Sequence, residues 1–109
     1  MIKYYLTASG RSPVEEFIQN LPDDTRLEVV DAIVLLEGGQ NLDMPLSRNL
    51  SNIKSGLHEL RFSDKAGQVR VIYFIKKDDA IYLLHAFRKK KQAIPIKDMG
   101  LIVKRLKEV

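Results

Sequence analysis

Cysteine is absent from this sequence of 109 residues. That absence excludes disulfides, thiolate metal sites and a cysteine nucleophile. Long hydrophobic runs are absent as well, because no window holds the roughly 18 consecutive apolar residues that a membrane-spanning helix requires. The apolar run within residues 1–11 is too short for a signal peptide. We therefore expect a cytoplasmic protein that does not enter a membrane.

Motifs for metals and nucleotides are missing too. The six glycines form no glycine-rich phosphate loop. No group of Asp, Glu and His has the spacing of a metal site, so we expect no metal and no other cofactor. The length suits a single core, and residues 1–109 are predicted to form one domain.

The charged residues are distributed unevenly along the chain. Residues 1–47 contain 3 Lys or Arg and 8 Asp or Glu, whereas residues 48–109 contain 15 and 6. The formal net charge is therefore −5 in the first segment and +9 in the second. Such a basic segment is expected of a surface that binds phosphates. The alternative is a small basic protein whose lysines are simply solvated.

Two helices are predicted in the acidic half, after a short strand at 2–7. The segment 12–15 reads Ser-Pro-Val-Glu, in which serine and glutamate can form a capping box and proline takes the first helical position. This helix should end near Pro22, and a second should run from Asp23 to Gly38. The apolar stripe expected to face the core comprises Val29, Val30, Ile33, Val34 and Leu36.

Three strands and a last helix are predicted in the basic half. The strands span 57–63, 69–76 and 80–88, and the turns 64–67 and 77–79 between them favour an antiparallel meander. The segment 40–55 lacks periodicity and is interpreted as a connection, and the helix follows Pro95. The predicted order is βααβββα, an α+β fold whose antiparallel sheet packs against two N-terminal helices and a C-terminal helix.

Two arginines are predicted to face each other in this meander. Pairing around the 64–67 turn places Arg61 opposite Arg70. Like charges directly opposite destabilise a sheet, so the pair needs a compensating anion, and Glu59 lies diagonally across. One interpretation is a solvated ladder of these three side chains. The other is a fork for a phosphate, because each guanidinium offers planar, bidentate donors.

Two histidines and a cationic run accompany the arginines. His85 lies in an apolar run, which is typical of a core histidine, and His58 should point toward the helices. Either imidazole could transfer protons near neutral pH. The run 88–91, Arg-Lys-Lys-Lys, is either a solvated strand end or a second phosphate-binding element beside the arginines.

The ordered set of segments resembles the RelE/HigB superfamily of toxin-antitoxin ribonucleases, particularly its phage-related HigB-like branch. The resemblance covers most of the chain. It rests on the segments Ser-Pro-Val-Glu-Glu-Phe at 12–17, Gly-Leu-His-Glu-Leu-Arg at 56–61, Val-Arg-Val-Ile-Tyr-Phe at 69–74, and Leu-Leu-His-Ala-Phe-Arg-Lys-Lys at 83–90. It implies a compact α+β fold, cleavage of messenger RNA on the ribosome, and a helix-turn-helix antitoxin as partner.

The resemblance also implies roles for individual residues. Arg61 matches the strand arginine that contacts the scissile phosphate, and Arg70 matches its companion on the neighbouring strand. Lys89 and Lys90 match the basic pair after the last strand, and His85 or Lys90 would transfer protons. The chain departs from the branch at Lys91, where threonine or serine is usual, and at Ile94, where a small polar residue is common. The residues expected to contact RNA are Lys54, Arg88, Lys89 and Lys91.

The implied reaction needs no metal. A base removes the proton of a ribose 2′-OH, the alkoxide attacks the adjacent phosphorus, and arginines stabilise the added charge. Ribosomal positioning of the RNA would compensate for a weak base. Two alternatives remain: a protein-binding toxin that inhibits gyrase, as the related ParE toxins do, and an inactive phage-derived remnant.

Overall fold

The computed structural model describes residues 1–76, 80–89 and 93–109. The predicted turn at 77–79, Lys90 and Lys91 therefore lie outside the described residues. The elements are β1 (Ile2–Tyr4), α1 (Pro13–Gln19), α2 (Asp23–Glu37), β2 (Ser47–Asn49), β3 (Leu57–Asp64), β4 (Gly67–Ile75), β5 (Ile81–Lys89) and α3 (Ile96–Glu108). This order confirms the predicted α+β class and adds one strand, β2.

The three predicted strands of the basic half form the centre of a five-stranded sheet. Its strand order is β1-β5-β4-β3-β2, and β3, β4 and β5 make the expected antiparallel meander. β1 runs parallel to β5, with Ile2 beside Ile81, so the sheet is mixed and the expectation of an antiparallel sheet is wrong for this pair. Two helices and three strands separate β1 from β5 in the chain. No turn therefore sets their relative direction.

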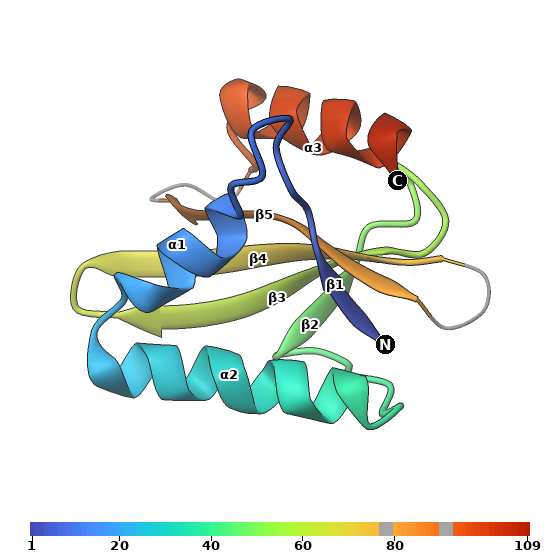
Figure 1. Ribbon diagram of the computed structural model, residues 1–109. Helices are drawn as coiled ribbons and strands as arrows, with labels where there is room; N and C mark the ends of the chain where they lie inside the picture. The colour runs from blue at the N-terminus through green and yellow to red at the C-terminus, as the bar shows by residue number, and fades with distance from the viewer. Residues whose placement is uncertain (77–79, 90–92) are drawn as a thin grey trace.

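Helices cover both faces of the sheet (Figure 1). α1 and α2 lie on one side of it and α3 on the other. The alternation of side chains along a strand divides the apolar residues between two cores. Leu60 and Phe62 of β3 pack in the core that α1 and α2 cover, whereas Leu57 packs with Ile102 of α3. Burial on both faces explains the continuous apolar runs of β4 and β5.

The predicted capping box at the start of α1 does not form. Ser12 is the N-cap residue and Pro13 is the first helical residue, as expected, but the serine side chain makes no capping hydrogen bond. Its hydroxyl oxygen is buried and has no hydrogen-bond partner among the described residues. Glu15 is exposed, and the neighbouring Glu16 pairs with Arg11. Proline and the packing of the helix against the sheet therefore define this helix start.

The predicted core stripe of α2 is only partly buried. Val29, Ile33 and Leu36 are buried, as expected, and Leu36 lies in the last turn before the C-cap residue Gly38. Two other members, Val30 and Val34, are 41% and 62% exposed. The sheet contacts a narrower face of α2 than the five apolar residues span, so the outer ones remain in solvent.

β2 is the element that sequence periodicity did not reveal. It lies within the segment 40–55 and pairs antiparallel with β3, where Arg48 lies beside Glu59. Three polar residues are too short a run to show alternation and have low β-propensity. The pairing is instead held by tertiary contacts, because the Ser47 hydroxyl hydrogen-bonds the Tyr73 hydroxyl at 2.7 Å.

Gly56 fixes the entry into β3, and its substitution tests the fold. Its φ is +89°, and a Cβ there would lie 2.6 Å from the carbonyl oxygen of Ile75. Gly56→Ala should therefore lower the free energy of unfolding by about 1–3 kcal/mol in urea denaturation. Gly100→Ala is the control, because a Cβ at Gly100 in α3 meets nothing within 4 Å. It should raise stability by about 0.5–1 kcal/mol. Wild-type stability of Gly56→Ala would contradict this geometry.

Candidate functional site

The predicted pairing of Arg61 with Arg70 is confirmed. The two residues are direct partners in the register of β3 and β4. Their neighbours Leu60 and Val71 point into the core beneath α1 and α2. Since side chains alternate along a strand, both arginines project from the opposite face of the sheet, together with Glu59.

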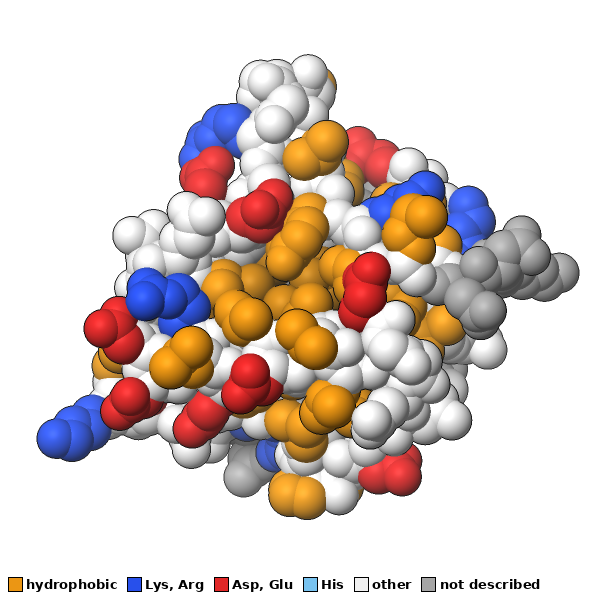
Figure 2. Space-filling view, turned by 60° about the horizontal axis from the view of Figure 1, so that its bottom comes forward, with side chains coloured by type: hydrophobic (Ala, Val, Ile, Leu, Met, Phe, Trp, Pro, Cys, Tyr) orange, Lys and Arg blue, Asp and Glu red, His pale blue; other side chains and the backbone are white. Residues whose placement is uncertain are grey.

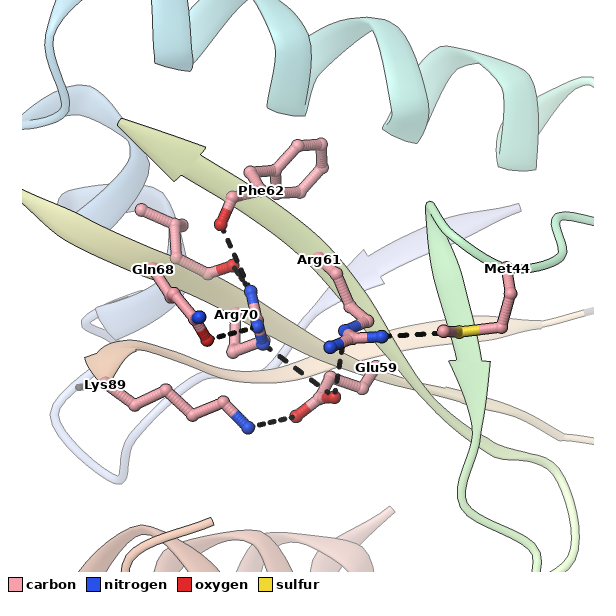
Figure 3. A network of polar contacts seen from close by, with 8 residues as sticks. Met44, Glu59, Arg61, Phe62, Gln68, Arg70 and Lys89 are labelled. Carbon is pink, nitrogen blue, oxygen red and sulfur yellow. Dashed lines mark hydrogen bonds and ion pairs between the residues drawn. The ribbon is translucent and has the colours of Figure 1, made fainter. Parts of the chain in front are cut away.

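Glu59 is fully buried among three cations (Figure 3). Its Oε1 lies 3.9 Å from Arg61 Nε and 3.8 Å from Arg70 Nε, and its Oε2 lies 3.7 Å from Lys89 Nζ. Neither carboxylate oxygen has a hydrogen-bond partner in the described part of the chain, so the contacts are longer-range ion pairs. Glu59, Arg61, Arg70 and Lys89 are called the Glu59 cluster. Its three cations and one anion give a formal charge of +2.

Arg70 is the most firmly held cation of the Glu59 cluster. It is 3% exposed, and its Nη1 donates hydrogen bonds to the carbonyl oxygens of Phe62 at 3.1 Å and Val69 at 3.0 Å. Its Nη2 donates to the side-chain oxygen of Gln68. Burial lowers the pKa of Arg70, the charge of Glu59 opposes this effect, and Arg61 adds to it. The Nε of Arg70 makes no hydrogen bond within the described ranges and points toward Glu59.

Arg61 is the cation of the pair that solvent reaches. Its side chain is 25% exposed, and its Nη1 contacts the sulfur of Met44 at 3.4 Å. Although they project from the face opposite α2, Arg61 and Arg70 also line a groove of about 710 Å³ beside β3, whose other wall includes Glu28 and Asp31 of α2. A ligand in this groove would therefore meet Arg61 on one side and the carboxylates of Glu28 and Asp31 on the other.

Lys89 is buried, which the sequence did not indicate. Its side chain is 2% exposed, although it belongs to a run of four cations at a strand end. Burial lowers the pKa of Lys89, Glu59 opposes this effect, and Arg70, Arg61 and Arg48 add to it. Arg48 is an exposed residue that sequence reasoning missed, because its strand was not predicted. Its position beside Glu59 extends the positive field of the cluster.

Arg88 lies on the opposite face of the sheet from the Glu59 cluster. Its guanidinium donates to both carboxylate oxygens of Asp64, at 2.7 and 2.8 Å. The Thr25 hydroxyl of α2 donates to the same carboxylate at 3.0 Å. Arg88 above all, and then Thr25, holds the pKa of Asp64 well below its usual range despite partial desolvation. Arg88 thus helps to anchor α2. Lys54, another predicted RNA contact, is exposed in the β2–β3 connection, outside the cluster.

His85 links β5 to α3. Its Nε2 lies 2.7 Å from Asp98 Oδ1, and its Nδ1 accepts a hydrogen bond from Arg105 at 3.1 Å. Both ring nitrogens therefore have partners, with the proton of the neutral ring assigned to Nε2. Burial lowers the pKa of His85, while the hydrogen bond to Asp98 opposes this effect. Phe87 stacks on His85 and separates it along the strand from Lys89. A role in proton transfer remains a prediction.

His58 takes the orientation that the alternation of β3 predicts. It lies on the same face as Leu60 and stacks on Tyr73, with ring centroids 5.0 Å apart. Burial lowers its pKa. His58 therefore lies on the other side of the sheet from the Glu59 cluster.

Two predicted absences can be compared with the described residues. Within them, no group of three or more His, Asp or Glu side chains could hold a metal ion. None of the helices in the described ranges combines the length and the apolar character needed to span a bilayer.

The fold and a match to a family's sequence pattern define the class of protein. The mixed sheet with three helices is compatible with a RelE-like fold. The sequence pattern of the family described as phage-derived protein Gp49-like (DUF891) matches residues 16–107, so the chain belongs to this family. The family is part of the RelE/HigB-like toxin superfamily. A search of curated proteins finds no match to the chain.

Replacing the central carboxylate tests the electrostatic account of the Glu59 cluster. Glu59→Gln keeps the size of the side chain but removes the negative charge that lies 3.7–3.9 Å from Arg61, Arg70 and Lys89. The free energy of unfolding should fall by about 3–5 kcal/mol in urea denaturation. Inorganic phosphate should restore part of it, relative to chloride at equal ionic strength, because an anion can replace the carboxylate.

The matched control is Glu16→Gln, which removes a carboxylate from an exposed ion pair with Arg11. Little change in stability is expected there, because surface ion pairs contribute little. A Glu59→Gln variant as stable as wild type, or one that responds to phosphate and chloride alike, would contradict the assigned role of Glu59.

Proposed function

We propose that this protein is a HigB-like toxin of a type II toxin-antitoxin system, which cleaves messenger RNA on the ribosome. The observation that supports this proposal most strongly is the Glu59 cluster, in which Arg61 and Arg70 are paired across two strands. The three cations and the one carboxylate of the cluster have a formal net charge of +2. Membership of a toxin superfamily makes a phosphodiester substrate the natural ligand for that charge.

The reaction requires positive charge where the phosphorane forms. In the proposed mechanism, a base takes the proton of the ribose 2′-OH, the 2′-oxygen attacks phosphorus, and the 5′-oxygen of the next nucleotide leaves with a proton. Arg61, the more exposed of the two, would contact the phosphate, while Arg70, fixed by three hydrogen bonds, adds positive charge beside it. Donors held in position before the reaction cost no reorganisation in the transition state.

The base and the acid that transfer protons are not assigned to particular residues. His85 and Lys90 stay predictions for this role, because His85 is bound to Asp98 and Arg105 and Lys90 lies outside the described residues. Positioning of the RNA by the ribosome would compensate for a weak base. The proposal places the protein in the cytoplasm with a helix-turn-helix antitoxin as its partner.

Arg61→Ala is the variant that tests the proposed activity. Removal of one donor to the transition state typically costs about 2.7–4 kcal/mol, so transcript cleavage should fall by about 10²–10³-fold. Cleavage is measured by mapping transcript ends after induction in cells. Arg61 makes one side-chain hydrogen bond among the described contacts, to Met44, so the variant should fold. Arg11→Ala, at an exposed arginine of the other half of the chain, is the control and should cleave like wild type.

Each alternative predicts another result in the same experiment. Equal cleavage by wild type and Arg61→Ala, with equal thermal stability, would contradict the assigned site. Growth arrest with intact transcripts would indicate a ParE-like inhibitor of a protein target. Normal growth after induction of the wild type would indicate an inactive phage-derived remnant.

A further inference from the structure

α2 presents apolar side chains to solvent as well as to the core. Leu27, Val30 and Val34 are 59%, 41% and 62% exposed, although the opposite side of the helix already buries Val29 and Ile33. The three exposed residues are spaced by three and four positions, so they form one outward stripe. Contiguous apolar surface of this kind typically marks an interaction site. We call it the α2 stripe.

Acidic side chains surround the α2 stripe. α2 carries five carboxylates, at Asp23, Asp24, Glu28, Asp31 and Glu37. Its one cation, Arg26, is already paired with Asp23 at 2.8 Å. The helix therefore has a formal charge of −4. On the face that α2 brings forward, Figure 2 shows hydrophobic side chains gathered with acidic ones around and between them.

The same acidic flank forms one wall of the groove that leads to Arg61. Glu28, Asp31 and Leu35 lie on the α2 side, and Pro45 and Leu46 add apolar surface opposite. The apolar surface beside the stripe is thus continued by a groove rather than by a flat surface. An elongated segment, such as a helix, can lie along α2 and contact this groove.

The charge of α2 distinguishes between the occupants that this surface could have. Nucleic acid and anionic lipid would be repelled by five carboxylates. A second copy of the chain, with its own α2 packed against the first, would bring ten carboxylates together around a two-fold axis. Repulsion between these like charges disfavours such a dimer. A cationic partner is attracted by the same carboxylates, and its apolar residues can cover the α2 stripe.

We propose that the α2 stripe docks a cationic amphipathic helix of a partner protein. Leucine-like side chains of the partner contact Leu27, Val30 and Val34, and its lysines or arginines face Glu28 and Asp31. The α2 stripe includes no residue of the Glu59 cluster, although the groove beside it also reaches Arg61, and the proposal holds whether or not the protein cleaves RNA.

Labelled model peptides test the proposal on the full-length protein. One amphipathic peptide of about 18 residues, long enough to form a helix when bound, carries a leucine stripe flanked by lysines. A second has the same leucines flanked by glutamates, and a third is a scrambled version of the first. Fluorescence anisotropy should give affinity at least tenfold higher for the lysine peptide than for the other two. That preference should weaken as salt is added.

Two double variants locate the binding surface. Leu27→Ser with Val34→Ser should weaken the lysine peptide at least tenfold, and circular dichroism should show an unchanged fold because both residues are exposed. Glu28→Lys with Asp31→Lys should reverse the preference, so that the glutamate peptide binds more tightly. Glu15→Lys with Glu16→Lys makes the same change in charge on exposed residues of α1 and should leave the preference unchanged.

Three outcomes would overturn the proposal. The first is equal binding of the lysine and scrambled peptides, which would indicate charge attraction alone and no site for an amphipathic helix. The second is binding that survives the serine variant or the charge reversal on α2. The third is a dimer in sedimentation velocity that Val34→Asp dissociates, because a second copy would then cover the stripe.

Discussion

The site depends on the attraction between one buried carboxylate and the three cations that surround it. Glu59 is fully buried, and its two oxygens lie 3.7–3.9 Å from Arg61, Arg70 and Lys89. Three neighbouring strands supply these side chains, so their pairing register sets the geometry. Glu59 compensates the like charges of Arg61 and Arg70, which lie directly opposite each other in the sheet. With it, the arginines are held close together and still attract an anion.

The helices hold this sheet from both sides through polar anchors at either face. On the α2 side, Arg88 and Thr25 share the carboxylate of Asp64. On the α3 side, His85 lies between Asp98 and Arg105. From the sequence, Arg88 is expected to contact RNA and His85 to transfer protons. In the structure both side chains bind residues that connect β5 to its surroundings. Arg61, in contrast, faces a groove.

Much of the fold could be predicted from the sequence because local signals specified it. The turn at 64–67 fixed the register that places Arg61 opposite Arg70, and alternation placed His58 on the α2 side. The rest depends on tertiary contacts without a local signal. β2 is held by partners distant in sequence, and the face of α2 that packs on the sheet is too narrow to bury Val34. The burial of Lys89 likewise arises from the cluster, because a cationic run usually indicates a solvated end.

The most direct test is to observe the arginine side chains by ¹⁵N NMR during titration with an RNA dinucleotide analogue that lacks the attacking 2′-OH. The Nε resonances of Arg61 and Arg70 should shift together and saturate, because the phosphate would occupy the positive field of the cluster. Those of Arg11 and Arg26, which lie in exposed ion pairs on and beside the acidic helices, should not move. Unchanged Arg61 and Arg70 resonances at concentrations that saturate binding would contradict a phosphate site at the Glu59 cluster.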